Sequence, residues 1–374
     1  MDPSKHDDPT RTVIARPGAP EAGADDDRAH YLVVVEGDGP GRRFEVGADI
    51  LVIGRTKPAH IIVADALASR NHCKVGLIMN ELFVMDLNSS NGTYVAGKKI
   101  NKYILTAGER FTIGSTVFEH EWRSRREVEA ALKIDNDLER AKTYVRSLLP
   151  HPIDAGPLRT DWVLQPSAKL GGDLFGYHFI DDRTFAIYLL DVTGHGTGAA
   201  MHAVSVMNVL RQRTVPGVDM KDPSRAATHL NEMFPMESHG GMLLSLGYGV
   251  YDIPSRRLAF TSAGHHASYL VDAQDHIIAL EVSNVLIGMI PGYAYRAGSV
   301  EAPPGSTLYV FSDGVFEIEP ANGGEWDLER FLALVAEKPE QDKKESQRIL
   351  EAVKGRTGRQ AFEDDFTLVV TALG

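Results

Sequence analysis

One stretch of the chain, residues 123–149, contains neither glycine nor proline and keeps a helical spacing throughout. Its apolar residues recur at intervals of three and four, which places them on one stripe of a helix. The members of this hydrophobic stripe are Ala131, Ile134, Leu138, Ala141, Val145 and Leu148. The sequence LLPHP follows, and its prolines end a helix. We therefore predict a helical linker with coiled-coil-like spacing over residues 123–150.

The hydrophobic stripe has two interpretations. In the first, residues 131–148 pair with the same residues of a second chain, because a long connecting helix projects away from the domains at its ends. The protein is then a homodimer, and the two alanines in the stripe make the pairing weak enough to be switched. In the second interpretation, the helix is single and packs its stripe on its own domain.

The overall composition is that of a soluble protein with more than one domain. A length of 374 residues exceeds what one hydrophobic core usually organises. The net charge of −12 disfavours nucleic acid and membranes as partners, since both require basic surfaces. A single cysteine, Cys73, excludes an internal disulfide. No apolar run approaches the roughly 18 residues of a membrane span, and the start lacks a signal peptide, so we expect a cytoplasmic protein.

The segments on the two sides of the linker differ in pattern. Residues 1–28 are rich in Pro, Gly, Ala and Asp, and we expect them to form a disordered tail. Residues 29–122 consist of short β-type runs separated by turn residues, which predicts an all-β sandwich. Residues 151–374 mix antiparallel strands with helices at 197–211 and 328–336. The expected fold is therefore multidomain, an all-β part followed by an α+β part.

Two aspartates in the α+β part are predicted to face each other. If the runs LFGYHFI and TFAIYLL form a hairpin that turns near Asp182, Asp173 lies nine residues before the turn and Asp191 nine residues after it. Like charges in this position repel, and a divalent cation between them removes the repulsion. Carboxylate oxygens are the ligands that Mg²⁺ and Mn²⁺ prefer, so the pair indicates a metal site.

Two further aspartates extend this site. Asp313 ends one apolar run and Asp364 precedes another, so antiparallel strand order brings both to one edge of a sheet. Four carboxylates at one edge are enough for two metal ions roughly 3.5–4 Å apart. Taken singly, each aspartate is equally well explained as a carboxylate at a turn or a strand end. The glycine-rich turn after Asp191 lacks the spacing of a phosphate-binding loop.

Five motifs in this half resemble, in this order, the SpoIIE/RsbU type of the metal-dependent PP2C (PPM) phosphatases: GGDLFG, DVTGHGTGAAM, SAGHH, FSDGVFE and DDFTLVV. The resemblance covers residues 151–374. It implies a central β-sandwich flanked by helices that holds two Mn²⁺ or Mg²⁺ ions and hydrolyses phosphoserine or phosphothreonine on proteins. Substrates in this branch are often anti-sigma-factor antagonists.

The same resemblance implies a role for each acidic residue. Asp191 bridges both ions, and the carbonyl group of Val192 binds one of them. Asp173 completes one metal site, whereas Asp313 and Asp364 complete the other. The two ions then activate a water that attacks phosphorus directly, so no covalent enzyme intermediate is needed.

Some residues near these motifs stay unassigned or depart from the family pattern. His195, His265 and His266 are equally well explained as turn residues and as general acids. Lys169 is the nearest counterpart of the phosphate-binding arginine found in eukaryotic relatives. At residues 286–288 the chain has LIG where relatives often have PLG, which changes a loop but removes no predicted ligand.

The β-rich half carries polar motifs at its strand ends, IGRTKP, ASRNH and SSNGTYVAG, that resemble the forkhead-associated (FHA) domain over residues 29–122. An arginine beside hydroxyl and amide groups suits a phosphate dianion. The resemblance implies a phosphothreonine reader with His72 as a structural histidine and Ala96 where many members have asparagine. The implied phosphothreonine-binding residues are Arg55, Ser69, Arg70, Ser90 and Asn91.

The sequence thus predicts a signalling phosphatase that acts on a phosphoprotein and carries its own phosphothreonine reader. The ligand of the reader is a partner phosphorylated by an upstream Ser/Thr kinase, or the chain's own tail through Thr10 or Thr12. The alternative is an adaptor whose reader recruits partners while the second half is an inactive phosphatase-like scaffold. The intact set of four aspartates argues against this alternative.

Overall fold

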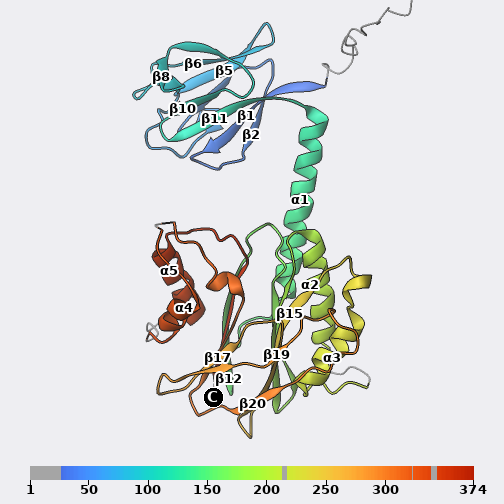
Figure 1. The fold of residues 1–374 in the computed structure, drawn as a ribbon. Coiled ribbons are helices and arrows are strands. Elements are labelled where there is room, and N and C mark those ends of the chain that lie inside the picture. The colour runs from blue at the N-terminus through green and yellow to red at the C-terminus, as the bar shows by residue number, and fades with distance from the viewer. Residues whose placement is uncertain (1–26, 213–216, 322, 338–342) are drawn as a thin grey trace, which may run out of the picture. The chain divides into compact units, whose positions relative to one another are not determined.

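The fold was analysed in a computed structural model, which describes residues 27–212, 217–321, 323–337 and 343–374 (Figure 1). The chain forms two compact units that divide within the linker helix, at Asp135 and Asn136. The predicted tail lies outside the described residues except at its end, where Arg28 already begins a strand. Thr10 and Thr12 also lie outside them.

The first unit is a sandwich of two sheets, as the short punctuated runs predict. Their strands pair antiparallel except for residues 53–54, which pair parallel with residues 61–62. One sheet has the order β2-β1-β11-β10-β7-β8 and contains β1 (Arg28–Glu36), β2 (Arg43–Val46), β7 (Thr93–Val95), β8 (Lys98–Ile100), β10 (Arg110–Ile113) and β11 (Thr116–Ser124). The other has the order β4-β3-β5-β6-β9 and contains β3 (Leu51–Gly54), β4 (Ile61–Ile62), β5 (Cys73–Ile78), β6 (Glu81–Asp86) and β9 (Lys102–Leu105).

The core between these sheets is formed by alternating residues of the strands. Leu32, Ile53, Phe111 and Phe118 are fully buried, and the rings of Phe111 and Phe118 stack at 5.1 Å. Cys73 is free and buried in the same core, and burial raises the pKa of its thiol. An inert structural cysteine is what this environment produces.

The linker is helical, as predicted, and forms α1 (Arg125–Leu148). Its first turn buries Val128 against Ala29 and Tyr31 of the first unit. At its other end, Val145 and Leu148 pack on the core of the second unit, whereas Ile134 in the middle is 62 % exposed. The C-terminal half of the hydrophobic stripe therefore packs on its own domain, as the second interpretation predicts. Ile134, in the N-terminal half of the stripe, is exposed.

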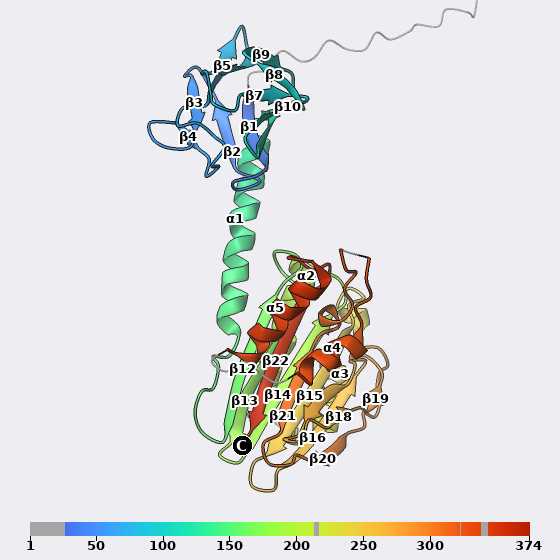
Figure 2. The same ribbon diagram turned by 90° about the vertical axis from the view of Figure 1, so that its left-hand side faces the viewer.

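The second unit contains two sheets (Figures 1 and 2), which are antiparallel except where residues 262–263 pair parallel with residues 283–284. The β22 sheet has the order β12-β22-β21-β17-β18 and contains β12 (Leu158–Gln165), β17 (Ser268–Val271), β18 (Ile277–Leu280), β21 (Thr307–Phe311) and β22 (Phe366–Leu373). The β14 sheet has the order β13-β14-β15-β16-β19, with β20 paired to β16. Its strands are β13 (Leu174–Asp181), β14 (Thr184–Val192), β15 (Leu244–Asp252), β16 (Arg257–Ala263), β19 (Ser283–Asn284) and β20 (Gly298–Glu301).

Helices cover the outer faces of both sheets in the second unit. The β14 sheet is contacted by α2 (Thr197–Leu210) and α3 (Pro223–Met233), and the β22 sheet by α5 (Glu345–Thr357), which packs beside α4 (Leu328–Val335). Short 3₁₀ turns lie at η1 (Met236–Ser238) and η2 (Asp313–Val315). The expected α+β sandwich flanked by helices is therefore confirmed. Among the described residues, no helix combines the length and apolar composition needed to cross a membrane.

Two helices of this unit were not predicted from the sequence. Helix α3 begins at Pro223 behind Asp222, whose carboxylate accepts a 2.9 Å hydrogen bond from the Ser224 N–H. This Asp-Pro-Ser start was a readable signal. No side chain next to the start of α5 caps this helix. Instead, the Asp161 carboxylate of β12 accepts hydrogen bonds from the first N–H groups of the helix at 3.0 Å. A cap supplied from a distant strand leaves no local sequence pattern.

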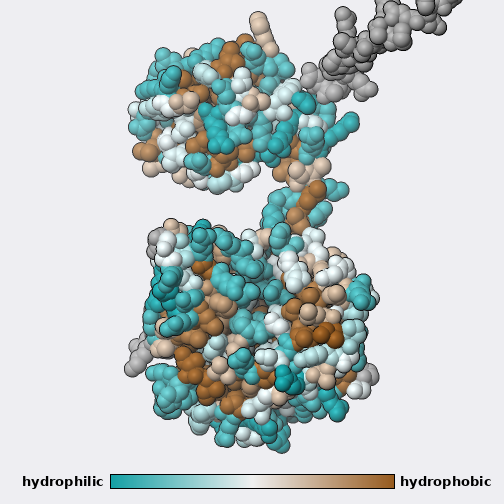
Figure 3. Space-filling view, viewed as in Figure 1, coloured by the Kyte–Doolittle hydropathy of each residue, from teal (hydrophilic) through white to brown (hydrophobic). Residues whose placement is uncertain are grey.

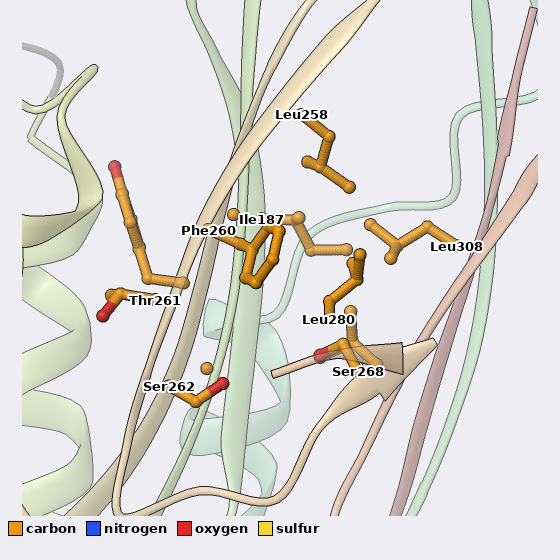
Figure 4. A pocket seen from close by; sticks show the side chains of 12 residues that line it. Ile187, Leu258, Phe260, Thr261, Ser262, Ser268, Leu280 and Leu308 are labelled. Atoms are coloured by element: carbon orange, nitrogen blue, oxygen red, sulfur yellow. The ribbon is translucent and has the colours of Figure 1, made fainter. Parts of the chain in front are cut away.

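The inner faces of the two sheets enclose a small cavity of about 20 Å³ (Figure 4). Leu258 and Ile187 come from the β14 sheet, and Leu280 and Leu308 from the β22 sheet.

Hydrophobic side chains also reach the surface in the region of α2 and α3 (Figure 3), where Met201 of α2 is 71 % exposed.

Candidate active site

The first pair of candidate ligands lies where the hairpin register predicts it. Strands β13 and β14 pair antiparallel, with Leu174 opposite Leu190 and Gly176 opposite Tyr188. Asp173 directly precedes β13, so continuing this register places it opposite Asp191, the next-to-last residue of β14. The predicted hairpin is therefore confirmed.

The second pair comes from neighbouring strands of the other sheet. Asp313 lies just beyond the end of β21 and opens the turn η2, and Asp364 lies just before β22. These strands pair antiparallel, and the Ser312 N–H donates to the Thr367 carbonyl at 3.0 Å beyond the last ladder pair. Antiparallel order therefore brings Asp313 and Asp364 to the same end of the β22 sheet.

The carboxyl groups of the two pairs influence one another. Burial, reinforced by the charges of Asp191 and Asp365, raises the pKa of Asp173 well above its ordinary value. Burial, reinforced by the charges of Asp313 and Asp364, raises the pKa of Asp191 to about 7. Asp173 and Asp191 belong to the β14 sheet and the other two to the β22 sheet, so aspartates from both sheets converge on one place.

Asp364 shares this environment. Burial raises its pKa, an effect opposed by the hydrogen bond from the Asp365 N–H to its carboxylate at 2.7 Å and reinforced by the charge of Asp313. The proximity of His195 also lowers the pKa of Asp364. The glycine-rich turn that carries His195 therefore lies beside the carboxylates.

These residues fit divalent cations by their chemistry. The side chains supply carboxylate oxygens, the donors that Mg²⁺ and Mn²⁺ prefer, and their mutual repulsion is the kind that a dication removes. In the described part of the chain, no three His, Cys, Asp or Glu side chains are already drawn together at metal-ligand geometry. The two findings agree, because charges couple over several ångströms, whereas ligands must come within about 2.0–2.6 Å of one ion.

The loop before β13 runs directly against the Val192 carbonyl. The Val192 N–H donates to the Gly172 carbonyl at 3.3 Å, and a Cβ added to Gly172 would lie 2.5 Å from the Val192 oxygen. Only glycine permits this approach. The Gly196 N–H donates to the Leu170 carbonyl at 3.2 Å, so the loop and the glycine-rich turn are held together.

A set of buried polar residues around these aspartates was missed in the sequence. The Thr367 hydroxyl donates to Asp173 Oδ2 at 2.6 Å, and the Ser312 hydroxyl donates to the Asp365 carbonyl at 2.9 Å. The Asp365 carboxylate in turn accepts from the Ser167 N–H at 2.8 Å. The motif DDFT contains two of these residues, Asp365 and Thr367. The sequence does not show which of the two neighbouring aspartates, Asp364 or Asp365, has the buried side chain.

The histidines of the SAGHH motif are buried. Burial lowers the pKa of both His265 and His266, which disfavours the charged form of each ring. His265 Nδ1 lies 3.1 Å from the Ser245 hydroxyl, and Ser245 pairs with Asp191 across the β14–β15 ladder. The His266 ring packs against Phe311 at 4.8 Å. Neither contact indicates a catalytic role for His265 or His266.

In the first unit, His72 joins the two loops that carry the candidate phosphothreonine ligands. Its Nδ1 accepts from the Ser69 N–H at 3.0 Å, and its Nε2 lies 3.1 Å from the Gly92 carbonyl. The Ser69 hydroxyl accepts from the Ser90 N–H at 3.0 Å. His72 is fully buried, as a structural histidine would be.

The five candidate reader residues line one cleft of about 660 Å³. Arg55 Nη1 donates to the Ala66 carbonyl at 3.2 Å, and Asn91 Nδ2 donates to the Leu67 carbonyl at 2.7 Å. Both bonds shape the loop that forms one wall. Lys57 also lines the cleft, although the sequence motifs did not indicate it as a binding residue. Its arginine and lysine side chains make the cleft suitable for an anion.

The architecture and both groups of residues define a two-domain protein of a known type. The profile of the family described as Stage II sporulation protein E (SpoIIE) matches residues 181–373, more than half of the chain, and the chain therefore belongs to this family. The FHA domain profile matches residues 51–114, so the first unit carries an FHA domain. Both resemblances found in the sequence motifs are thereby confirmed.

Two relatives each match a different part of the chain. "Phosphoserine phosphatase RsbP" of Bacillus subtilis (strain 168) is 26% identical over 190 residues, which cover 50% of this chain and 46% of that protein. "FHA domain-containing protein FhaB" of Mycobacterium tuberculosis (strain ATCC 25618 / H37Rv) is 34% identical over 92 residues, 24% of this chain and 59% of that protein. The chain thus spans about half the length of the relatives it matches.

A solved structure has the same fold in the second half. The SiaA-PP2C domain of Pseudomonas aeruginosa superposes with a TM-score of 0.56 at 20% identity, covering 66% of this chain and 99% of that domain. The second unit therefore has the PP2C fold.

Proposed function

We propose that the second unit is a protein serine/threonine phosphatase that requires two divalent cations, Mn²⁺ or Mg²⁺. The convergence of four aspartates from two sheets, three of them with raised pKa values, carries the proposal. Membership of the SpoIIE family and similarity to a protein named as a phosphoserine phosphatase support the reaction type. The substrate class is phosphoserine or phosphothreonine on a regulatory protein, with an anti-sigma-factor antagonist as the first candidate.

The residues of the chain take the following parts in this proposal. Asp191 and Val192 are the last two residues of β14. There the Asp191 carboxylate would bridge the ions and the Val192 carbonyl would bind one of them, while Asp173 would complete one metal site and Asp313 with Asp364 the other. When bound, the ions supply an activated water and offset the charge of the phosphoryl group. Asp173 is held by the Thr367 hydroxyl, which fixes one carboxylate oxygen in place.

The first unit is proposed to read phosphothreonine. Arg55 and Arg70 offer charged donors at the cleft, while Ser69, Ser90 and Asn91 offer neutral ones. Its ligand is a partner protein phosphorylated by a Ser/Thr kinase, or the tail of the chain itself at Thr10 or Thr12. Exposed Ile134 in the N-terminal half of α1 supports pairing of that half between two chains.

Phosphate release tests the enzymatic proposal. Wild-type protein should hydrolyse p-nitrophenyl phosphate and a phosphoserine peptide in Mn²⁺ and lose this activity in excess chelator. Asp191→Asn should be inactive under both conditions. Asp182→Asn, which removes the same charge in the exposed turn between β13 and β14, should behave as wild type. A wild-type protein that binds phosphothreonine peptides but releases no phosphate would instead be the adaptor.

A further inference from the structure

The loop of residues 167–173 leads into β13 and ends in a proposed metal ligand, and it is called the strap here. Its contacts converge on one buried side chain. Asp365 Oδ1 accepts from the Ser167 N–H at 2.8 Å and from the Ser167 hydroxyl at 3.0 Å. Asp365 Oδ2 accepts from the Asp173 N–H at 3.2 Å. One carboxylate, 5 % exposed, therefore holds both ends of the strap.

The main chain of Asp365 is tied to the other metal-binding segment. Its carbonyl accepts from the Ser312 hydroxyl at 2.9 Å, and that hydroxyl accepts from the Thr367 N–H at 3.1 Å. Ser312 directly precedes Asp313. Asp365 therefore links the segments that carry Asp173 and Asp313, through its side chain and its main chain respectively.

The strap has a glycine at the position where it passes this carboxylate. A Cβ added to Gly171 would lie 1.9 Å from Asp365 Oδ2, which is far inside contact distance. The backbone of Gly171 is not in the left-handed region, so an alanine would be strained only by this contact. The Asp365 carboxylate therefore occupies space that a side chain at residue 171 would need.

A charged group at residue 365 carries an energetic cost. The Asp365 carboxylate lies beside the metal-site aspartates, since its Oδ2 is 3.2 Å from the Asp173 nitrogen, so its negative charge adds to the repulsion within the site. An asparagine would avoid that charge, but its NH₂ group would face either Ser167 or the Asp173 N–H, where an acceptor is needed. Accepting hydrogen bonds from both ends of the strap requires two acceptor oxygens.

We propose that Asp365 is a positioning residue for the divalent-cation site: it holds the strap so that Asp173 stays opposite Asp191, and it does not bind the ions itself. The proposal rests on the proposed function. Both oxygens of Asp365 are engaged with strap donors, which distinguishes this carboxylate from its neighbour Asp364. Partners that orient metal ligands typically change metal affinity by about 10–100-fold when they are replaced.

The test compares Asp365→Asn with Glu363→Gln, a control that removes a charge from a side chain 69 % exposed two residues away. Mn²⁺ affinity is measured by electron paramagnetic resonance, and the metal dependence of p-nitrophenyl phosphate turnover is measured in parallel. Asp365→Asn should weaken Mn²⁺ binding by about 10–100-fold, and turnover at saturating Mn²⁺ should fall by less than the affinity does. Glu363→Gln should match wild type in both.

Hydrogen–deuterium exchange gives a readout that needs no metal. In chelator, the strap amides of Asp365→Asn should exchange faster than those of wild type and of Glu363→Gln. Gly171→Ala should give the same two effects, because its Cβ displaces the Asp365 carboxylate. Ser167→Ala combined with Asp365→Asn should cost less affinity than the sum of the single changes, since both act through one contact.

Three results would overturn the proposal: Mn²⁺ affinity within twofold of wild type, unchanged strap exchange, or complete loss of one metal equivalent with an undisturbed strap. The last result would make Asp365 a ligand. A wild-type protein that binds Mn²⁺ yet releases no phosphate would refute the phosphatase function only, because affinity and exchange would still decide the role of Asp365.

Discussion

The repulsion among the metal-site aspartates predicts that removing one of their charges stabilises the metal-free protein. The change is Asp191→Asn, which keeps the size of the side chain and replaces a carboxylate by a neutral amide. Asp191 has an ordinary pKa of 3.8 and a pKa of about 7 in the folded protein. Between these values the folded state holds a proton that the unfolded chain has lost, so the free energy of unfolding falls as pH rises.

The size of the effect follows from the shift. Roughly three pKa units correspond to about 4 kcal/mol of lost stability at pH 8, and this is an upper value because neighbouring carboxyls share protons. At pH 5 only about 1.5 kcal/mol of this penalty is present. In chelator, Asp191→Asn should therefore exceed wild type in stability by up to these amounts, with the larger gain at pH 8. In saturating Mn²⁺ the order should reverse, since only wild type gains binding energy.

Urea denaturation followed by tryptophan fluorescence measures this stability. The chain has three tryptophans, and a Trp122→Phe background leaves Trp162 and Trp326, both in the second unit. Asp182→Asn in the same background controls for the loss of one negative charge. An Asp191→Asn variant that is no more stable than wild type at pH 8, or whose gain is the same at pH 5, would refute the mutual repulsion.

Three further predictions concern other parts of the molecule. Arg55→Ala should weaken binding of a phosphothreonine peptide by about 1.5–3 kcal/mol in calorimetry; equal affinity of wild type for the unphosphorylated peptide would contradict the reader assignment. Ile134→Asp should lower the molar mass seen by light scattering if α1 pairs between chains, and an unchanged mass would leave α1 as a spacer. Leu308→Ala should enlarge the cavity between the sheets and cost about 2–5 kcal/mol of unfolding free energy, and a cost below 1 kcal/mol would show that the cavity collapses.

The sequence predicted the parts of the fold that have a regular local pattern. The short apolar runs of residues 29–122 form strands, as predicted. Asp173 and Asp191 lie in the predicted register because a hairpin with a short turn leaves little freedom. The strands β4, β8 and β9 were missed, since runs of two to four residues, partly polar, carry too little periodicity. The strand β12 was missed because polar residues interrupt its run.

The charged residues of the candidate site could be predicted from the sequence. The residues that hold them in place by hydrogen bonds could not. The motif DDFT indicates carboxylates near a strand, but which of Asp364 and Asp365 faces the strap depends on how the strand enters the sheet. The hydroxyl groups of Ser312 and Thr367 join segments far apart in the chain, and such pairings follow only from the packed sheets. The hydrophobic stripe of α1 keeps the same residue spacing along its length, but its two halves lie in different environments. Val145 packs on the core of the second unit, whereas Ile134 is exposed.

The central claim is that four aspartates form one site for two divalent cations that make the second unit a phosphatase. A titration of the chelator-treated full chain with Mn²⁺, with bound metal and phosphate release measured in the same samples, tests it most directly. The account predicts two bound equivalents per chain, activity that rises as they fill, and loss of at least one equivalent together with the activity in Asp313→Ala. Phosphate release that is undiminished in excess chelator, or an Asp313→Ala variant with wild-type binding and turnover, would contradict it.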